Sequence, residues 1–114
     1  MYPIIKTRDN SKEQFRYSNV SVLYSHQNCR CFYCNKFMRF ETFVPGKPER
    51  KMGYTIDHLF PRTLGFGLVG NAVLACRACN EKKANRPPTP VEIVRAWELY
   101  NKIGVQFIAT IIFP

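Results

Sequence analysis

Four of the five cysteines form two closely spaced pairs, and these are the residues best suited to bind a metal. Cys31 and Cys34 form one C-x2-C pair, and Cys76 and Cys79 form the second. Two intervening residues let both thiolates face one tetrahedral ion, and two such pairs complete the four-sulfur shell typical of structural zinc. We therefore expect these four cysteines to hold a structural zinc ion.

Disulfides and redox-active thiols are the alternative uses of such pairs. The count of five cysteines is odd, and the N-terminal residues lack the apolar core of a signal peptide, so we expect a reducing compartment in which disulfides are rare. Cys29 is interpreted as a spare thiol, with replacement of Cys31 in the metal shell as the alternative. Bound zinc would contribute folding free energy directly, so chelation is expected to unfold the domain.

Residues with catalytic chemistry lie between the cysteine pairs and directly after the second pair. Asp57 and His58 are adjacent, Asn71 follows a glycine-rich stretch, and Asn80 comes straight after Cys79. An imidazole, with an unperturbed pKa of about 6.5, is a suitable general base near neutral pH. The oxygens of Asp57 and Asn80 are the ligands that Mg²⁺ prefers, whereas thiolates suit zinc.

The order of these elements resembles that of the HNH endonuclease family, which runs C-x2-C, D-H-x-x-P, a central Asn, and C-x2-C-N-x-x-K. In this sequence the elements are Cys31/Cys34, Asp57-His58-Leu59-Phe60-Pro61, Asn71, and Cys76-Arg77-Ala78-Cys79-Asn80-Glu81-Lys82-Lys83. The resemblance covers roughly residues 18–86. It implies a small α+β domain with a ββα-metal core, also called a His-Me finger, that hydrolyses DNA phosphodiester bonds with a divalent ion.

The resemblance also implies a role for each matching residue. His58 matches the general base that takes a proton from the attacking water, and Asn71 matches the residue that orients this base through the loop. Asp57 and Asn80 match the ligands of the catalytic ion, Mg²⁺ or Mn²⁺, which makes the chain an H-N-N variant. The four paired cysteines match the structural zinc frame.

A large positive charge is carried by a chain that is apolar enough to fold. The sequence has 17 Lys+Arg and 8 Asp+Glu, a net charge of +9, with 46% hydrophobic residues. Such a surface favours a polyanionic partner, nucleic acid first, anionic lipid second and acidic proteins third. The basic residues expected to contact phosphate, with solvated surface charges as the alternative, are Arg62, Arg77, Lys82, Lys83 and Arg86.

Several short elements are predicted around these positions. They are a helix over 18–27 (with a strand as the alternative), strands over 37–44 and 54–59, a loop over 65–71, a short apolar segment over 72–75 and an exposed helix over 77–85. Adjacent residues of a strand point to opposite faces. Asp57 and His58 therefore reach one site only if the strand bends or ends there.

The strongest helix signal lies near the C-terminus. Thr89 and Glu92 have the spacing of a capping box, and Gly104 is a natural stop. The apolar face expected to enter the core comprises Ile93, Val94, Trp97 and Tyr100. After Gly104, residues 105–113 are expected to form a terminal strand or an extended segment that packs on the body.

These observations predict three regions: an N-terminal extension over 1–17, a nuclease core over 18–86, and a C-terminal helix and strand over 87–114. The expected activity is endonucleolytic cleavage of double-stranded DNA. The expected location is the cytoplasm, and the protein is expected to be encoded by a bacterium or a phage. A second copy of the chain or a restriction or phage packaging complex is an expected partner, and a membrane is not. The alternatives are a non-catalytic, zinc-stabilised nucleic-acid-binding module and an interaction protein that pairs through residues 105–113.

Overall fold

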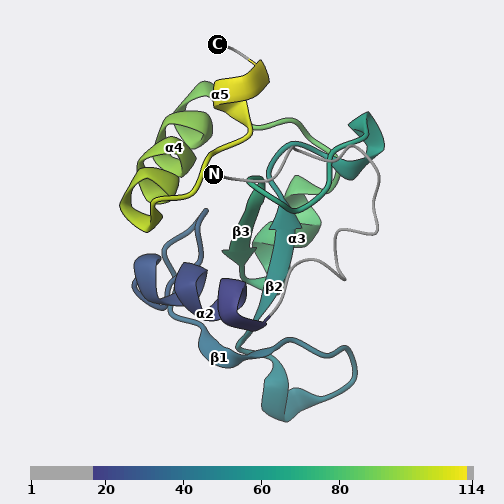
Figure 1. Ribbon diagram of the computed structural model, residues 1–114. Coiled ribbons are helices and arrows are strands. Elements are labelled where there is room, and N and C mark those ends of the chain that lie inside the picture. The colour runs from purple at the N-terminus through teal and green to yellow at the C-terminus, as the bar shows by residue number, and fades with distance from the viewer. Residues whose placement is uncertain (1–16, 113–114) are drawn as a thin grey trace.

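A three-stranded sheet lies among the helices of this chain (Figure 1). The computed structural model describes residues 17–112, which form the expected α+β domain. The strands are β1 (Arg39–Thr42), β2 (Gly53–His58) and β3 (Ala72–Ala75). β2 is the middle strand, parallel to β1 and antiparallel to β3.

The β2–β3 pair has a regular register and leads into a helix. Thr55 lies opposite Ala75, and the pairing continues without a shift to His58 opposite Ala72. Every residue of β3 is buried, which explains why it consists only of small and branched apolar side chains. Helix α3 (Arg77–Lys83) follows β3 and packs against β2, so the chain order is strand, strand, helix. The strand expected over 54–59 and the helix expected over 77–85 are confirmed.

The pairing of β1 with β2 depends on a close backbone approach. The register shifts between Arg39 and Thr42. A Cβ atom on Gly53 would collide with the backbone of residues 41–43, so glycine is required where the two strands meet. The connection between them contains a short 3-10 helix, η1 (Pro48–Arg50).

Helix α2 (Tyr17–His26) confirms the helical prediction for 18–27 and excludes the strand alternative. Its buried residues Val20 and Leu23 belong to the core, and the helix packs against β3 and α4. Directly after α2, the Gln27 amide donates to the Leu74 carbonyl and accepts from the Leu74 N–H, both at 2.9 Å. This side chain therefore pairs with β3 as a neighbouring strand would.

Helix α4 (Pro90–Ile103) begins and ends as predicted. The Thr89 hydroxyl accepts from the Glu92 N–H at 3.2 Å, and the Glu92 carboxylate accepts from the Thr89 N–H at 3.0 Å. Gly104 ends the helix with φ 86°, a left-handed conformation that glycine adopts without strain. The capping box is confirmed.

The predicted buried face of α4 is wrong in part. Trp97 is 46% exposed and Val94 is also exposed, whereas Ala96, Leu99 and Tyr100 are buried. The small Ala96 lets the helix approach the core closely, and the Tyr100 hydroxyl donates to the Ala72 carbonyl at 2.7 Å. The helix is therefore rotated relative to the face that the largest apolar residues define.

The terminal segment packs on the body but forms no strand within residues 105–112. Phe107 and Ile108 are buried, and the Ile108 N–H donates to the Gly70 carbonyl at 2.8 Å. The chain then forms the short helix α5 (Ala109–Ile112), whose backbone hydrogen bonds are local. For example, the Ile111 N–H donates to the Ile108 carbonyl at 2.9 Å. Local hydrogen bonding replaces the strand pairing that its β-prone residues predicted.

No helix within residues 17–112 is long and apolar enough to cross a membrane. Nearly all of the predicted N-terminal extension, 1–16, and residues 113–114 lie outside the described residues.

Candidate functional site

The two cysteine pairs meet in one cluster. The Sγ atoms of Cys31, Cys34, Cys76 and Cys79 all lie within 4.8 Å of one another, and Cys34 Sγ is 3.9 Å from Cys76 Sγ. Zn–S bonds of about 2.3 Å in a tetrahedron place the sulfurs about 3.8 Å apart. A disulfide needs about 2.05 Å, and all five cysteines are free thiols. The cluster therefore suits a metal such as zinc, and Cys29 lies outside it.

Local backbone geometry presents these thiols. The Cys31 N–H donates to the Lys36 carbonyl at 2.8 Å, and Asn35 completes the turn with φ 67°. Cys76 is the N-cap of α3, and Cys79 lies in its first turn. Burial raises the pKa of the Cys31 thiol, and a metal ion would bind this group as a thiolate.

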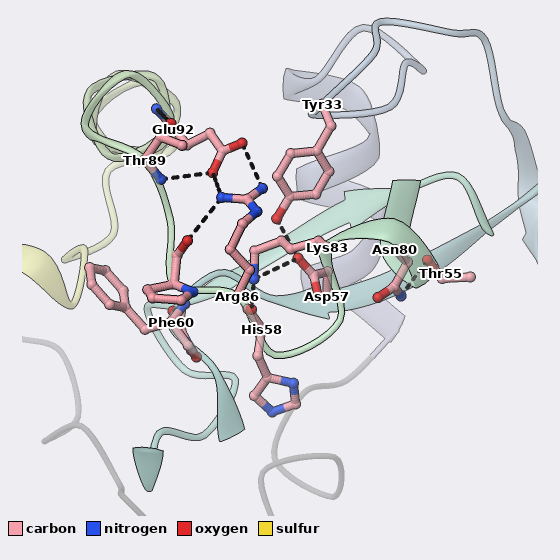
Figure 2. Close-up of polar contacts among 12 residues, drawn as sticks. Tyr33, Thr55, Asp57, His58, Phe60, Asn80, Lys83, Arg86, Thr89 and Glu92 are labelled. Atoms are coloured by element: carbon pink, nitrogen blue, oxygen red, sulfur yellow. Dashed lines mark hydrogen bonds and ion pairs between the residues drawn. The ribbon is translucent and has the colours of Figure 1, made fainter. Parts of the chain in front are cut away.

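A buried ion pair links the first cysteine pair to the end of β2 (Figure 2). Asp57 is 5% exposed and Lys83 is 2% exposed, and Lys83 Nζ lies 3.6 Å from Asp57 Oδ2. The same oxygen accepts from the Tyr33 hydroxyl, and Lys83 Nζ also donates to the His58 carbonyl at 3.0 Å. Burial raises the pKa of Asp57 and lowers that of Lys83, so the charged state of each depends on the other.

The burial of Lys83 corrects its predicted role as a phosphate contact. Its ammonium group faces Asp57 inside the protein because residues 80 and 83 share the side of α3 that packs on β2. The other basic residues predicted to contact phosphate are exposed. Arg77 pairs with Glu81 at 3.2 Å and Arg86 pairs with Glu92 at 3.1 Å. Arg62 and Lys82 are the other two exposed candidates.

Asn80 lies in the same strand–helix interface as Asp57 but contacts a different residue. Its Nδ2 donates to the Thr55 hydroxyl at 2.8 Å, and that hydroxyl donates to the Ala75 carbonyl at 2.7 Å. Thr55 and Asp57 are two residues apart on β2 and so face α3 together. The donor set, one carboxylate and one amide oxygen, suits a hard divalent cation. Lys83 already holds one oxygen of that carboxylate.

His58 is separated from Asp57 by the alternation of the strand. β2 ends at His58, as expected, but the pairing with β3 stays regular through both residues. Figure 2 shows the imidazole pointing away from the Asp57 carboxylate. The structure therefore does not bring the two side chains together on one face.

Asn71 is fully buried and fixes the backbone that follows His58. Its Oδ1 accepts from the Phe60 N–H at 2.8 Å, and its Nδ2 donates to the carbonyls of Phe60 at 2.9 Å and Gly67 at 2.8 Å. The Leu59 N–H donates to the Asn71 carbonyl at 2.9 Å. This one residue thus holds both ends of the loop that joins β2 to β3.

Sequence reasoning missed the contributions of Tyr33 and Lys83. Tyr33 lies between two cysteines, where a side chain is normally exposed, and nothing in its spacing points to Asp57. For Lys83 a signal was present, because a residue three positions after Asn80 lies on the same side of a helix.

No protein-family model matches this chain, and no curated protein matches it.

Proposed function

We propose that this protein is a metal-dependent endonuclease of the HNH type that hydrolyses DNA phosphodiester bonds, one nick per site. The observation that carries the proposal is the pair of hydrogen bonds between the Asn71 side chain and the Phe60 backbone, which fix the loop directly after His58. This is the role that the family resemblance assigns to a central Asn. The strand, strand, helix order of β2, β3 and α3, anchored beside a four-cysteine cluster, adds support.

In this proposal His58 is the general base that deprotonates the attacking water. Among residues 17–112, β1 pairs only with the first residues of β2, Gly53 and Tyr54, so within this range no strand pairs with the same edge of β2 at residues 55–58. A phosphate that approaches this edge can meet side chains from both faces of the strand. At this edge one phosphate can reach both the Asp57 and the His58 side chain, although the two side chains point to opposite faces of the strand.

The proposed catalytic ion is Mg²⁺ or Mn²⁺, held by Asp57 and Asn80, with zinc on the four cysteines. When bound, a hard cation stabilises negative charge on the phosphate as a Lewis acid. Lys83 and Tyr33 both contact Asp57 Oδ2, so the ion would be held through the other carboxylate oxygen, Oδ1.

A non-catalytic, zinc-stabilised nucleic-acid-binding module is the second candidate. The buried pair of Asp57 and Lys83 favours it, because the carboxylate is neutralised without any metal. This candidate predicts salt-sensitive binding, with log K falling by about 0.9 per phosphate neutralised for each tenfold rise in salt. It predicts no cleavage products with any metal.

A plasmid-nicking assay separates the two candidates. His58→Ala is compared with the parent and with His26→Ala, which removes the only other histidine, an exposed residue at the end of α2. Bound zinc is measured in all three proteins, so that a folding defect is recognised. The endonuclease proposal expects nicking by the parent and by His26→Ala only when Mg²⁺ or Mn²⁺ is added. Undiminished nicking by His58→Ala would refute the assignment of the base.

A further inference from the structure

A basic groove lies beside the start of β2, away from His58. It has a volume of about 700 Å³ and runs between the β1–β2 connection and the first residues of α3. The connection projects from the end of the sheet at which β1 lies (Figure 1). Cavities of about 300–1,000 Å³ enclose ligands of drug size, which is also the size of a nucleotide.

The groove has the chemistry of a site for a polyanion. Its charged lining residues are Lys36, Lys47, Lys51 and Arg77, and no acidic residue lines it. The three lysines are exposed, and within residues 17–112 none of them forms an ion pair.

Apolar side chains complete the groove. Phe43 and Met52 contribute to the wall, and the Arg77 guanidinium lies 5.5 Å from the centre of the Phe43 ring. A positively charged groove with an aromatic side chain is the combination that binds a nucleic-acid strand, since phosphates meet the cations while sugars and bases meet apolar surface.

We infer that this groove, which we call the β1–β2 groove, binds the sugar–phosphate backbone of a nucleic-acid strand, outside the proposed cleavage site. The inference rests on the proposed function for its substrate, DNA. An anionic membrane is less suitable, because lipid headgroups present a flat surface and the lysines line a concavity.

The position of the groove sets its role. Met52 directly precedes β2 and His58 ends it, so five residue steps of about 3.3 Å separate Gly53 from His58, about 17 Å. Duplex DNA rises about 3.4 Å per base pair, so about 17 Å corresponds to about five base pairs for a duplex that runs along β2. Contacts there contribute to affinity and leave the hydrolytic step unchanged.

Paired charge reversals test this inference. Lys47→Glu with Lys51→Glu removes two groove cations, and Arg30→Glu with Lys102→Glu makes the same change of net charge at exposed residues outside the groove. Affinity for a short labelled DNA duplex is measured at several salt concentrations on zinc-loaded protein. We expect the groove variant to lose about tenfold or more in affinity and its salt slope to fall by about 1.8, 0.9 for each of two phosphates.

Equal losses in both double variants, or an unchanged salt slope, would overturn the inference, as would binding to anionic vesicles without binding to DNA. The nicking assay is run on the same proteins. At saturating DNA the groove variant should nick at the parental rate, and a slower rate would place the groove in catalysis instead. If the parent binds through the groove but never nicks, the proposed endonuclease fails and the groove stands. If nicking depends on His58 while both double variants bind alike, only the groove fails.

Discussion

The buried pair of Asp57 and Lys83 makes the sharpest stability prediction. Substituting Lys83→Met keeps most of the side-chain volume but leaves the Asp57 carboxylate without its cation in a site where both residues are almost fully buried. Removing one partner of a buried ion pair costs about 3–5 kcal/mol. A domain of this size has a total stability of about 5–15 kcal/mol, so about a fifth or more of the free energy of unfolding is at stake.

Urea unfolding followed by far-UV circular dichroism, at a fixed zinc concentration, measures this loss. With a slope of about 2 kcal/mol per molar urea, the midpoint should fall by about 2 M. Lys82→Met is the matched control, because it makes the same change one residue earlier at an exposed position of α3. Its effect should stay within about 0.5 kcal/mol.

A double variant distinguishes an unpaired charge from lost packing. Asp57→Leu combined with Lys83→Met removes both charges, and it should recover much of the stability that Lys83→Met loses, because an apolar pair needs no compensation. The reasoning is refuted if Lys83→Met costs less than about 1 kcal/mol, or if the double variant is no more stable than the single one.

Two further predictions concern metal and pH. Chelation should abolish the helical signal in circular dichroism, because structural zinc contributes about 10–16 kcal/mol, as much as the whole stability of the domain, and an unchanged spectrum would contradict this. Burial raises the pKa of Glu92, but the hydrogen bonds from Arg86 and Thr89 outweigh it and hold the pKa below its usual value. The stability from Glu92 is therefore fully present above pH about 4.3 and lost as pH falls through the folded-state pKa. Glu92→Gln should flatten this part of the acid unfolding curve, and an identical pH profile would exclude the ion pair as its source.

Features with a local chemical cause could be predicted from the sequence. Thr89 and Glu92 cap α4 through bonds that span three residues, and Gly104 supplies a left-handed stop, so neither depends on the rest of the fold. In each C-x2-C pair the spacing likewise places both thiols on one side of the backbone, and the four cysteines form a cluster as expected. Trp97 and Ala96 show the limit, because the buried face of α4 depends on how closely the helix can approach the core.

The candidate site could be predicted as a set of residues but not as an arrangement. The role of Asn71 in the loop was implied by the family resemblance alone, and the structure shows that its side chain forms three hydrogen bonds within that loop. The spacing from Asn80 indicated on which side of α3 Lys83 lies, but not that Lys83 is buried, because a lysine on a polar helix is normally solvated. In the structure, the Asp57 carboxylate of β2 pairs with Lys83 inside the protein. The separation of Asp57 and His58 follows from strand alternation that remains regular to the last residue.

The cysteine cluster also closes a long loop of chain. Cys34 and Cys76 are 42 positions apart, and the segment between them contains all three strands together with Asp57, His58 and Asn71. Once the ends of a loop are tied, doubling its length costs only about 0.6 kcal/mol in closure entropy. The β1–β2 connection can therefore be lengthened or replaced at little thermodynamic cost, as long as Gly53 is kept. A scaffold built in this way can change what its groove recognises without rebuilding the strand end where the proposed chemistry takes place.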